Sequence, residues 1–115
     1  MLRGEIRLVD LDPARGSEAN KRRPAVVVSN ERANSSATRL GRGVVTVVPV
    51  TSNTDQIFPF QALLTAAATG LRRDSKAQAE QVRSIAVERV GAVLGQVPAA
   101  VMAQLDDALR LHLQL

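Results

Sequence analysis

The sequence predicts a mainly β fold, a small β-barrel of five or six short strands with an amphipathic C-terminal helix. Two observations predict it. Short runs of β-branched residues recur at close spacing between polar segments, a pattern typical of small barrels. The final segment instead repeats its apolar residues at helical spacing. With 115 residues and one uniform composition, the chain is expected to form a single domain, residues 1–115.

Composition narrows the class of function. The net charge of +4 and the pI near 11.0 suit a partner that carries phosphates. The chain has no Cys and one His, so we expect no disulfide framework, no thiolate site, no metal site and no cofactor. No segment resembles a signal peptide or approaches transmembrane length, so we expect a cytoplasmic protein without a membrane partner. Only Phe58 and Phe60 are aromatic, which argues against base stacking on an aromatic platform.

The first third of the chain predicts a strand, a loop and a second strand. Gly4–Leu11 alternates polar and apolar residues, as a strand with one solvated face does. Asp12-Pro13 begins a turn, and Ala14–Arg22 has the composition of a surface loop. Pro24 favours an extended backbone at the preceding arginine, and Ala25–Val28 reads as a strand buried on both faces. Arg23 is therefore expected where a mobile loop enters a rigid sheet.

The middle of the chain predicts a second loop and two further strands. Ser29–Gly43 holds Arg32, Arg39 and Arg42 among small polar residues and is predicted to be a mobile basic loop. Val44–Val50 is an apolar β run. Ile57–Thr65 is another, and Pro59 within it indicates an edge strand or a bulge.

The last third predicts a turn, a strand and the helix. Ala66–Asp74 is a turn region with a basic pair, and Lys76–Ile85 fits either helix or strand. Ala92–Val97 is a short strand, after which Pro98 occupies a plausible first helical position. The apolar stripe of the helix is formed by Val101, Met102, Leu105, Ala108, Leu109 and Leu113. His112 falls near this stripe and is interpreted as a half-buried helix residue rather than a catalytic one.

Elimination leaves a narrow chemistry. The sequence has no Gly-rich phosphate loop and no Cys/His ligand set, which leaves Arg, Glu, Thr, Ser and Gln as functional groups. These can support transesterification at an RNA phosphodiester, where the substrate's own 2′-hydroxyl is the nucleophile. The protein then supplies a proton acceptor, a proton donor and a cation for the developing charge, and the planar fork of Arg23 suits the last role. The alternative is that Arg23 is a solvated strand end.

Three other residues are candidates with plain alternatives. Thr51 ends the Val44–Val50 run, where its hydroxyl could meet Arg23, although a strand-end Thr also has a purely structural explanation. Glu80 lies in a stretch of small and apolar residues and needs a partner if it points inward. Glu18 is a solvated loop residue unless its loop closes over a ligand.

Four blocks in order, GSEANKRRPAVVVSN (16–30), VVPVTSN (47–53), FPFQALL (58–64) and AEQVRSI (79–85), resemble the MazF/PemK/Kid toxins. These are endoribonucleases of bacterial toxin–antitoxin modules. The resemblance covers nearly the whole chain and implies an SH3-like β-barrel that forms a homodimer. It implies sequence-specific, metal-independent cleavage of single-stranded RNA such as mRNA, with 2′,3′-cyclic phosphate and 5′-hydroxyl products.

The resemblance also implies roles for particular residues. The family's catalytic Arg falls on Arg23 and its catalytic Thr on Thr51, the acid of the GSE motif falls on Glu18, and a carboxylate used in a sister branch falls on Glu80. Sister toxins place an Arg two residues before that carboxylate, where this chain has Gln78. The acid–base pair is therefore Arg23 with Glu18 or a substrate-assisted variant, and a structural role for Glu80 stays open.

Binding roles follow from the same resemblance. The loop Ala14–Arg22 would gate the site, and the loop Ser29–Gly43 would hold RNA through Arg32, Arg39 and Arg42. Ser17, Arg22 and Gln81 are the other expected RNA-binding residues. A cognate MazE-like antitoxin with a disordered acidic segment would compete with RNA for these loops. The alternative is a non-enzymatic CcdB-like toxin that binds and poisons DNA gyrase.

Overall fold

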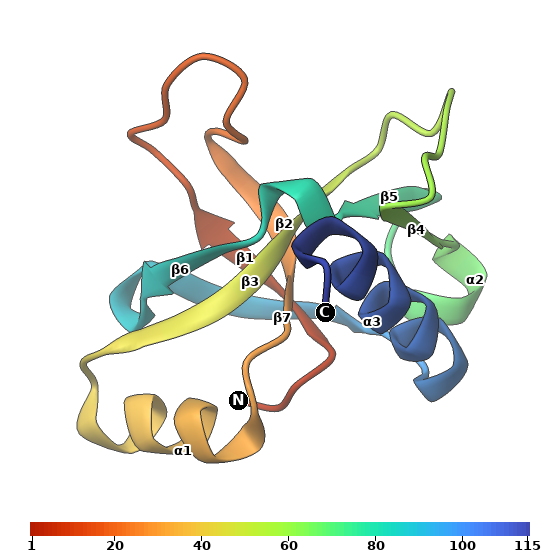
Figure 1. Cartoon of the computed structure of the whole chain (residues 1–115). Coiled ribbons are helices and arrows are strands. Elements are labelled where there is room, and N and C mark those ends of the chain that lie inside the picture. Colours follow the sequence, from red (N-terminus) through yellow and green to blue (C-terminus); the bar gives the residue numbers. More distant parts are fainter.

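A computed structural model describes residues 1–115 as one curved antiparallel sheet with helices packed around it (Figure 1). The order of strands in the sheet is β4-β5-β3-β2-β1-β7, and β6 pairs separately with β3. The strands are β1 (Glu5–Asp10), β2 (Arg22–Val27), β3 (Val44–Thr51), β4 (Gln61–Leu64), β5 (Ser75–Gln78), β6 (Arg83–Ala86) and β7 (Val90–Gln96). The helices are α1 (Glu31–Leu40), α2 (Ala66–Thr69) and α3 (Ala99–Leu113), with short 3₁₀ turns η1 (Ala79–Gln81) and η2 (Val87–Arg89). None of the helices is long and apolar enough to cross a membrane.

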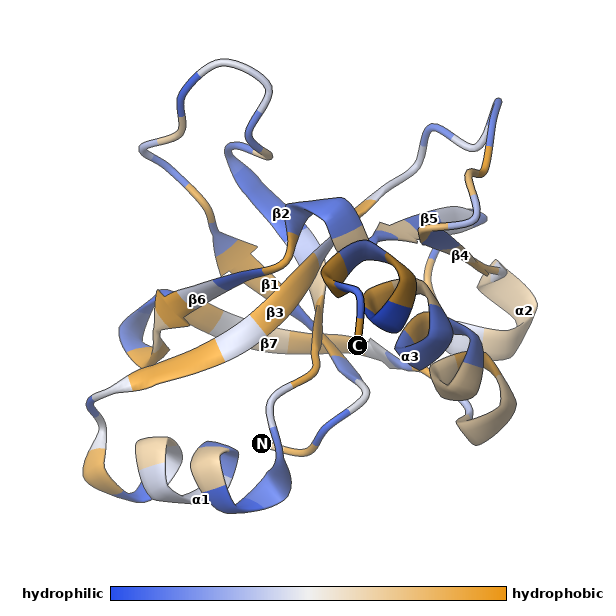
Figure 2. Cartoon of the chain, in the orientation of Figure 1, coloured by the Kyte–Doolittle hydropathy of each residue, from blue (hydrophilic) through white to orange (hydrophobic).

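The prediction of a mainly β fold with a C-terminal helix is confirmed, with seven strands rather than five or six. The central strand β2 explains why the sheet is stable. Ala25 and Val27 of β2 pack into one hydrophobic cluster and Val26 into another, and all three are fully buried. The predicted burial of this strand on both faces is thus confirmed, although the strand begins earlier than expected and contains Arg23. Figure 2 shows that β3 is also largely hydrophobic, whereas the loop between β1 and β2 is largely hydrophilic.

The prediction of a mobile loop over Ser29–Gly43 is wrong, because most of this segment forms the helix α1. Its ends carry ordinary helix signals. The Asn30 side chain accepts a hydrogen bond from the backbone of Ala33 (2.8 Å), and Gly41 closes the helix with a left-handed backbone (φ 65°). The apolar residues Ala33, Ala37 and Leu40 recur at helical spacing, but the helix buries only Asn34 and Ala37, so this apolar stripe is short and mostly exposed.

Two other predicted segments are corrected. The strand expected over Ile57–Thr65 is confined to Gln61–Leu64, because Pro59 lies in a turn and cannot donate to a sheet. The undecided segment Lys76–Ile85 is neither one helix nor one strand, since β5 gives way to η1 and then to β6. The turn region Ala66–Asp74 also contains the short helix α2.

The C-terminal helix α3 packs against β4 and η1. Leu105 and Ala108 are buried in the cluster that also contains Val26, as their helical spacing predicts. Pro98 is the N-cap of α3 rather than its first residue. The half-buried position predicted for His112 is wrong: His112 is exposed, and so is Leu113 (49%), because the helix extends past the sheet before it ends.

Candidate functional site

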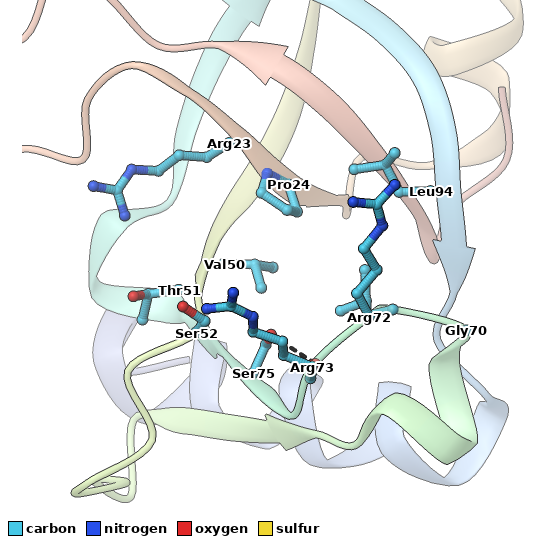
Figure 3. Close-up of a pocket in the computed structure, with 11 residues that line it drawn as sticks. Arg23, Pro24, Val50, Thr51, Ser52, Gly70, Arg72, Arg73, Ser75 and Leu94 are labelled. Atoms are coloured by element: carbon cyan, nitrogen blue, oxygen red, sulfur yellow. Dashed lines mark hydrogen bonds between the residues drawn. The ribbon is translucent and has the colours of Figure 1, made fainter.

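The antiparallel pairing of β2 and β3 brings the start of one strand beside the end of the other. Arg23 is the second residue of β2 and Thr51 the last of β3, and both line the same cavity of about 550 Å³ (Figure 3). This volume is in the range of small-molecule and nucleotide pockets. The remaining lining residues come from β2, from β3 and the residue after it, from β7, and from the segment between α2 and β5 with the first residue of β5: Pro24, Val50, Ser52, Gly70, Leu71, Arg72, Arg73, Ser75 and Leu94.

The Arg23 side chain is held by a loop residue. Its Nε donates to the backbone oxygen of Asn20 (2.6 Å) and its Nη2 donates to the Asn20 side-chain oxygen (3.1 Å). The backbone of Arg23 is fixed in register with Val9 of β1. Arg23 is partly exposed and makes no ion pair with a carboxylate. One edge of the guanidinium is therefore oriented by the protein while its charge stays available for an anion.

Thr51 is also partly exposed, and its hydroxyl accepts a weak hydrogen bond from the backbone of Asn53 (3.3 Å). This leaves the hydroxyl hydrogen free to donate. A guanidinium and a hydroxyl at one cavity wall form a suitable cradle for a phosphate, which accepts hydrogen bonds from both.

The charge of the cavity is strongly one-sided. Arg23, Arg72 and Arg73 line it, and no carboxylate does. From the sequence, Arg72 and Arg73 were recognisable only as basic residues of a turn, and Asn20 was not predicted to contribute to the site. Nothing in the local pattern shows that these residues face Arg23, because α2 and the turn after it determine the direction of the chain.

The two candidate carboxylates lie elsewhere. Glu18 and Glu80 line a separate hollow of about 300 Å³ with Gln81, Val82 and Arg83. Glu80 accepts a hydrogen bond from Gln61 (Oε2 to Nε2, 2.7 Å), and its other oxygen is buried without a partner. Glu18 accepts a hydrogen bond from the backbone of Arg15 (3.1 Å) within its own loop. The sequence therefore grouped four residues that the structure separates into two pairs.

Gln81 connects that hollow to the loop between β1 and β2. Its Oε1 accepts from the backbone of Ala19 and its Nε2 donates to the backbone oxygen of Ser17, both at 2.9 Å. Ser17 itself is exposed at the surface of the loop. Since Asn20 of the same loop holds Arg23, Gln81 and Arg23 are joined through a short stretch of chain.

The other predicted RNA-binding residues are spread over the surface. Arg22 is exposed at the start of β2, close to the cavity. Arg32 and Arg39 lie on α1 and Arg42 follows it, all three exposed. They are at the opposite end of β2 from Arg23 (Figure 1), and β2 with 6 residues is roughly 20 Å long. No group of three or more His, Asp or Glu side chains lies together as metal ligands would.

Known proteins match the whole chain. MazF9, an endoribonuclease of Mycobacterium tuberculosis, is 70% identical over 115 residues, covering 100% of this chain and 98% of its own. The crystal structure of MazF from Deinococcus radiodurans is similar with a TM-score of 0.81 and 26% identity, covering 100% and 97% of the two chains. A chain in a MazE–MazF crystal structure from the same organism is similar with a TM-score of 0.74 and 25% identity, covering 100% and 96%.

The family description that matches is that of the PemK-like, MazF-like toxins of type II toxin–antitoxin systems, and it covers residues 2–113. This match spans nearly all of the sheet, the loop that holds Arg23 and the helix α3. No relative supports the gyrase-binding alternative. The chain belongs to the PemK-like, MazF-like toxin family.

Proposed function

We propose that this protein is the endoribonuclease toxin of a toxin–antitoxin pair, cleaving single-stranded RNA such as mRNA at specific sequences without a metal ion. The observation that carries the proposal is the cavity shared by Arg23 and Thr51, in which cationic side chains are not opposed by any carboxylate. A polyanion is the natural ligand of such a cavity. The similarity to MazF9, which is named an endoribonuclease, supports the same conclusion.

The reaction is an in-line transesterification. The 2′-oxygen of the substrate loses its proton to a proton acceptor and forms a bond to the adjacent phosphorus. The bond from phosphorus to the 5′-oxygen breaks, and that oxygen gains a proton from a water molecule. The products are a 2′,3′-cyclic phosphate and a 5′-hydroxyl. Arg23 binds the non-bridging oxygens as negative charge develops on them, and Thr51 donates a hydrogen bond to the same phosphate.

Proton transfer is assigned to the loop that holds Arg23. Glu18 is the one carboxylate between Gly16 and Arg23. Because Asn20 of the same loop bonds the Arg23 side chain, a movement of this loop can bring the Glu18 carboxylate closer to the cavity. We assign it the role of proton acceptor. Glu80 instead hydrogen-bonds Gln61, whose own oxygen accepts from the backbone of Phe58 (3.1 Å). Glu80 is therefore a positioning residue for the segment that precedes β4.

The partners follow from the family and from charge. We propose a cognate MazE-like antitoxin whose acidic segment is attracted to the +4 surface, in line with the MazE–MazF structure of a relative. We also propose a homodimer, supported by exposed apolar side chains at the end of α3, including Leu111 (55%) and Leu113 (49%). The site of action is the cytoplasm, where mRNA is present.

The test is cleavage of a long mixed-sequence RNA in EDTA by three proteins: the unmodified chain, Arg23→Ala and Arg23→Lys. We expect discrete fragments with 5′-hydroxyl ends from the unmodified chain. Both variants are expected to lose roughly 10²-fold or more in kcat, because a lysine cannot reproduce the bidentate fork. Arg110→Ala is the charge-matched control, since Arg110 is exposed on α3 and paired with Asp107. Intact RNA from the folded unmodified chain on several substrates would overturn the proposal, and inhibition of gyrase would then be measured.

A further inference from the structure

The segment between α2 and β5 is a rigid support for two arginines. Gly70 ends α2 with a left-handed backbone (φ 83°), which turns the chain toward the cavity. The Asp74 carboxylate accepts a hydrogen bond from the backbone of Ala66 at the start of α2 (2.8 Å), so the two ends of the segment are tied together. The buried Ser75 hydroxyl donates to the backbone oxygen of Arg73 (3.0 Å).

The base of this segment is also packed tightly against the sheet. A Cβ atom at Gly95 of β7 would lie 2.4 Å from the backbone oxygen of Thr69, closer than any real side chain permits. The end of α2 therefore rests directly on the backbone of β7. This packing and the hydrogen bonds above fix where the arginine side chains begin.

The side chains of Arg72 and Arg73 are free to bind an anion. Arg72 and Arg73 are both exposed and neither forms an ion pair with a carboxylate. Figure 3 shows both extending from the segment into the cavity, Arg73 toward Thr51 and Ser52 and Arg72 toward Leu94. Figure 3 shows the Arg23 side chain extending away from this pair, on the far side of Pro24, so the three unpaired cations line the cavity at separate positions. Like charges around one cavity repel one another unless an anion lies between them.

We propose that Arg72 and Arg73 form a second phosphate subsite, which binds a phosphodiester of the RNA next to the one that is cleaved. The inference rests on the function proposed above and adds a binding role to residues outside the reacting centre. Arg23 and Thr51 on one wall bind the scissile phosphate, and the arginine pair on the other wall binds its neighbour. The strand thus crosses the cavity, with both phosphates held in fixed positions relative to the sheet.

An RNA backbone suits this subsite better than an acidic peptide. The arginine pair and the reacting centre share one cavity, so a single polyanion fills both without a gap. The guanidinium fork matches two oxygens of one phosphate, and such contacts carry no sequence information. The pair is therefore expected to add affinity uniformly across RNA sequences and to leave the preferred cleavage sequence unchanged.

The test combines binding and cleavage. A fluorescent 2′-O-methyl RNA of mixed sequence cannot be cleaved, because its nucleophile is blocked, and its affinity is measured by anisotropy between low and moderate salt. We compare the unmodified chain, Arg72→Ala, Arg73→Ala, the double alanine variant and the double lysine variant. The control is Arg110→Ala, which also removes one charge but lies outside the cavity. Thermal unfolding of each variant is measured in parallel.

We expect the double alanine variant to bind roughly tenfold more weakly at low salt. The slope of log affinity against log salt is expected to be less steep by about 0.7 for each RNA phosphate that the variant no longer neutralises. In cleavage of a mixed-sequence RNA, KM should rise while kcat at saturating RNA stays unchanged. The double lysine variant should keep the salt slope, since it keeps the charge.

A fluorescent acidic peptide is titrated in the same way. Three results would overturn the inference: an unchanged salt slope in the double alanine variant, a change in Arg110→Ala equal to that in either single alanine variant, or weakened binding of the acidic peptide with RNA affinity unaffected. The last result would assign the pair to the antitoxin instead. If the unmodified chain binds RNA through this pair but cleaves none, the proposed function fails while the phosphate subsite is supported. The two failures are therefore distinguishable.

Discussion

The Gln81→Ala variant tests whether the loop between β1 and β2 controls Arg23, the arginine proposed to be catalytic. The Gln81 amide makes two hydrogen bonds to the loop backbone, one to Ala19 and one to Ser17, each 2.9 Å long. A partly exposed hydrogen bond of this kind contributes about 1 kcal/mol net. Removing both therefore weakens loop docking by about 2 kcal/mol, which is roughly a 30-fold change in the equilibrium between docked and open loop.

The consequence for activity follows from Asn20, which lies in the same loop and hydrogen-bonds the Arg23 guanidinium twice. When the loop opens, Arg23 loses this orientation. The loop keeps other interactions, including the hydrogen bond from the backbone of Leu11 to that of Lys21 (2.9 Å) and the burial of Ala19, so the docked state is weakened rather than abolished. We expect kcat to fall by no more than roughly 30-fold, in proportion to the docked population.

Two measurements check this prediction. Hydrogen exchange at the Leu11 amide reports loop opening, because that amide bonds to Lys21 and not to Gln81 itself. Cleavage kinetics report the effect on kcat and KM. Gln81→Glu keeps the acceptor for Ala19 but sets an acceptor oxygen against the Ser17 backbone oxygen, so its effect should be at least as large as that of Gln81→Ala. Gln104→Ala, an exposed glutamine on α3, is the control.

The reasoning is refuted if Gln81→Ala leaves Leu11 exchange unchanged. A raised KM with unchanged exchange would mean that Gln81 contacts RNA directly, which is the role that the sequence resemblance implies. Unchanged exchange and unchanged kinetics would mean that neither role exists.

Two further predictions concern candidate residues that lie outside the cavity. Glu80→Gln keeps the acceptor for Gln61 and places an amide nitrogen where an oxygen is buried without a partner. We expect the melting temperature to be kept and kcat to fall less than roughly tenfold. A loss of roughly 10² to 10⁴ in kcat would show that Glu80 acts as a general acid or base instead. Replacing Arg32, Arg39 and Arg42 by Ala should weaken binding of a long RNA but leave unaffected an RNA too short to span β2, which is roughly 20 Å long; equal losses on both RNAs would contradict the separation seen in the structure.

The centre of the sheet was predictable because β2 and most of β3 are buried on both faces. Continuous apolar, β-branched runs such as Ala25–Val28 and Val44–Val50 are typical of buried strands, so they could be recognised without knowledge of their neighbours. The helix α1 was missed for the opposite reason. It buries only Asn34 and Ala37, and its identity is carried by caps at Asn30 and Gly41, which a prediction based on apolar spacing does not weigh.

The site was predictable only where strand ends fix it. Arg23 and Thr51 are adjacent because antiparallel strands that follow one another place a start beside an end, which the order of the chain already implies. The carboxylates have no such constraint. Glu18 belongs to a loop and Glu80 to a 3₁₀ turn, and their direction depends on hydrogen bonds to Arg15 and Gln61 that no local pattern encodes.

The separation of the arginines from the carboxylates also affects how the site can work. A cavity with three arginines and no carboxylate binds a phosphate strongly but cannot by itself accept a proton. The proton acceptor must then come from the substrate or from a segment that moves, and the loop that carries Glu18 is the one segment bonded to the Arg23 side chain. In the proposed mechanism, the separate hollow keeps the Glu18 carboxylate from neutralising Arg23 before RNA binds, since an ion pair would compete with the phosphate. Placing a permanent carboxylate beside Arg23, as in Asn20→Asp, should therefore weaken RNA binding, measured by anisotropy, even though the hydrogen bond to Arg23 becomes stronger.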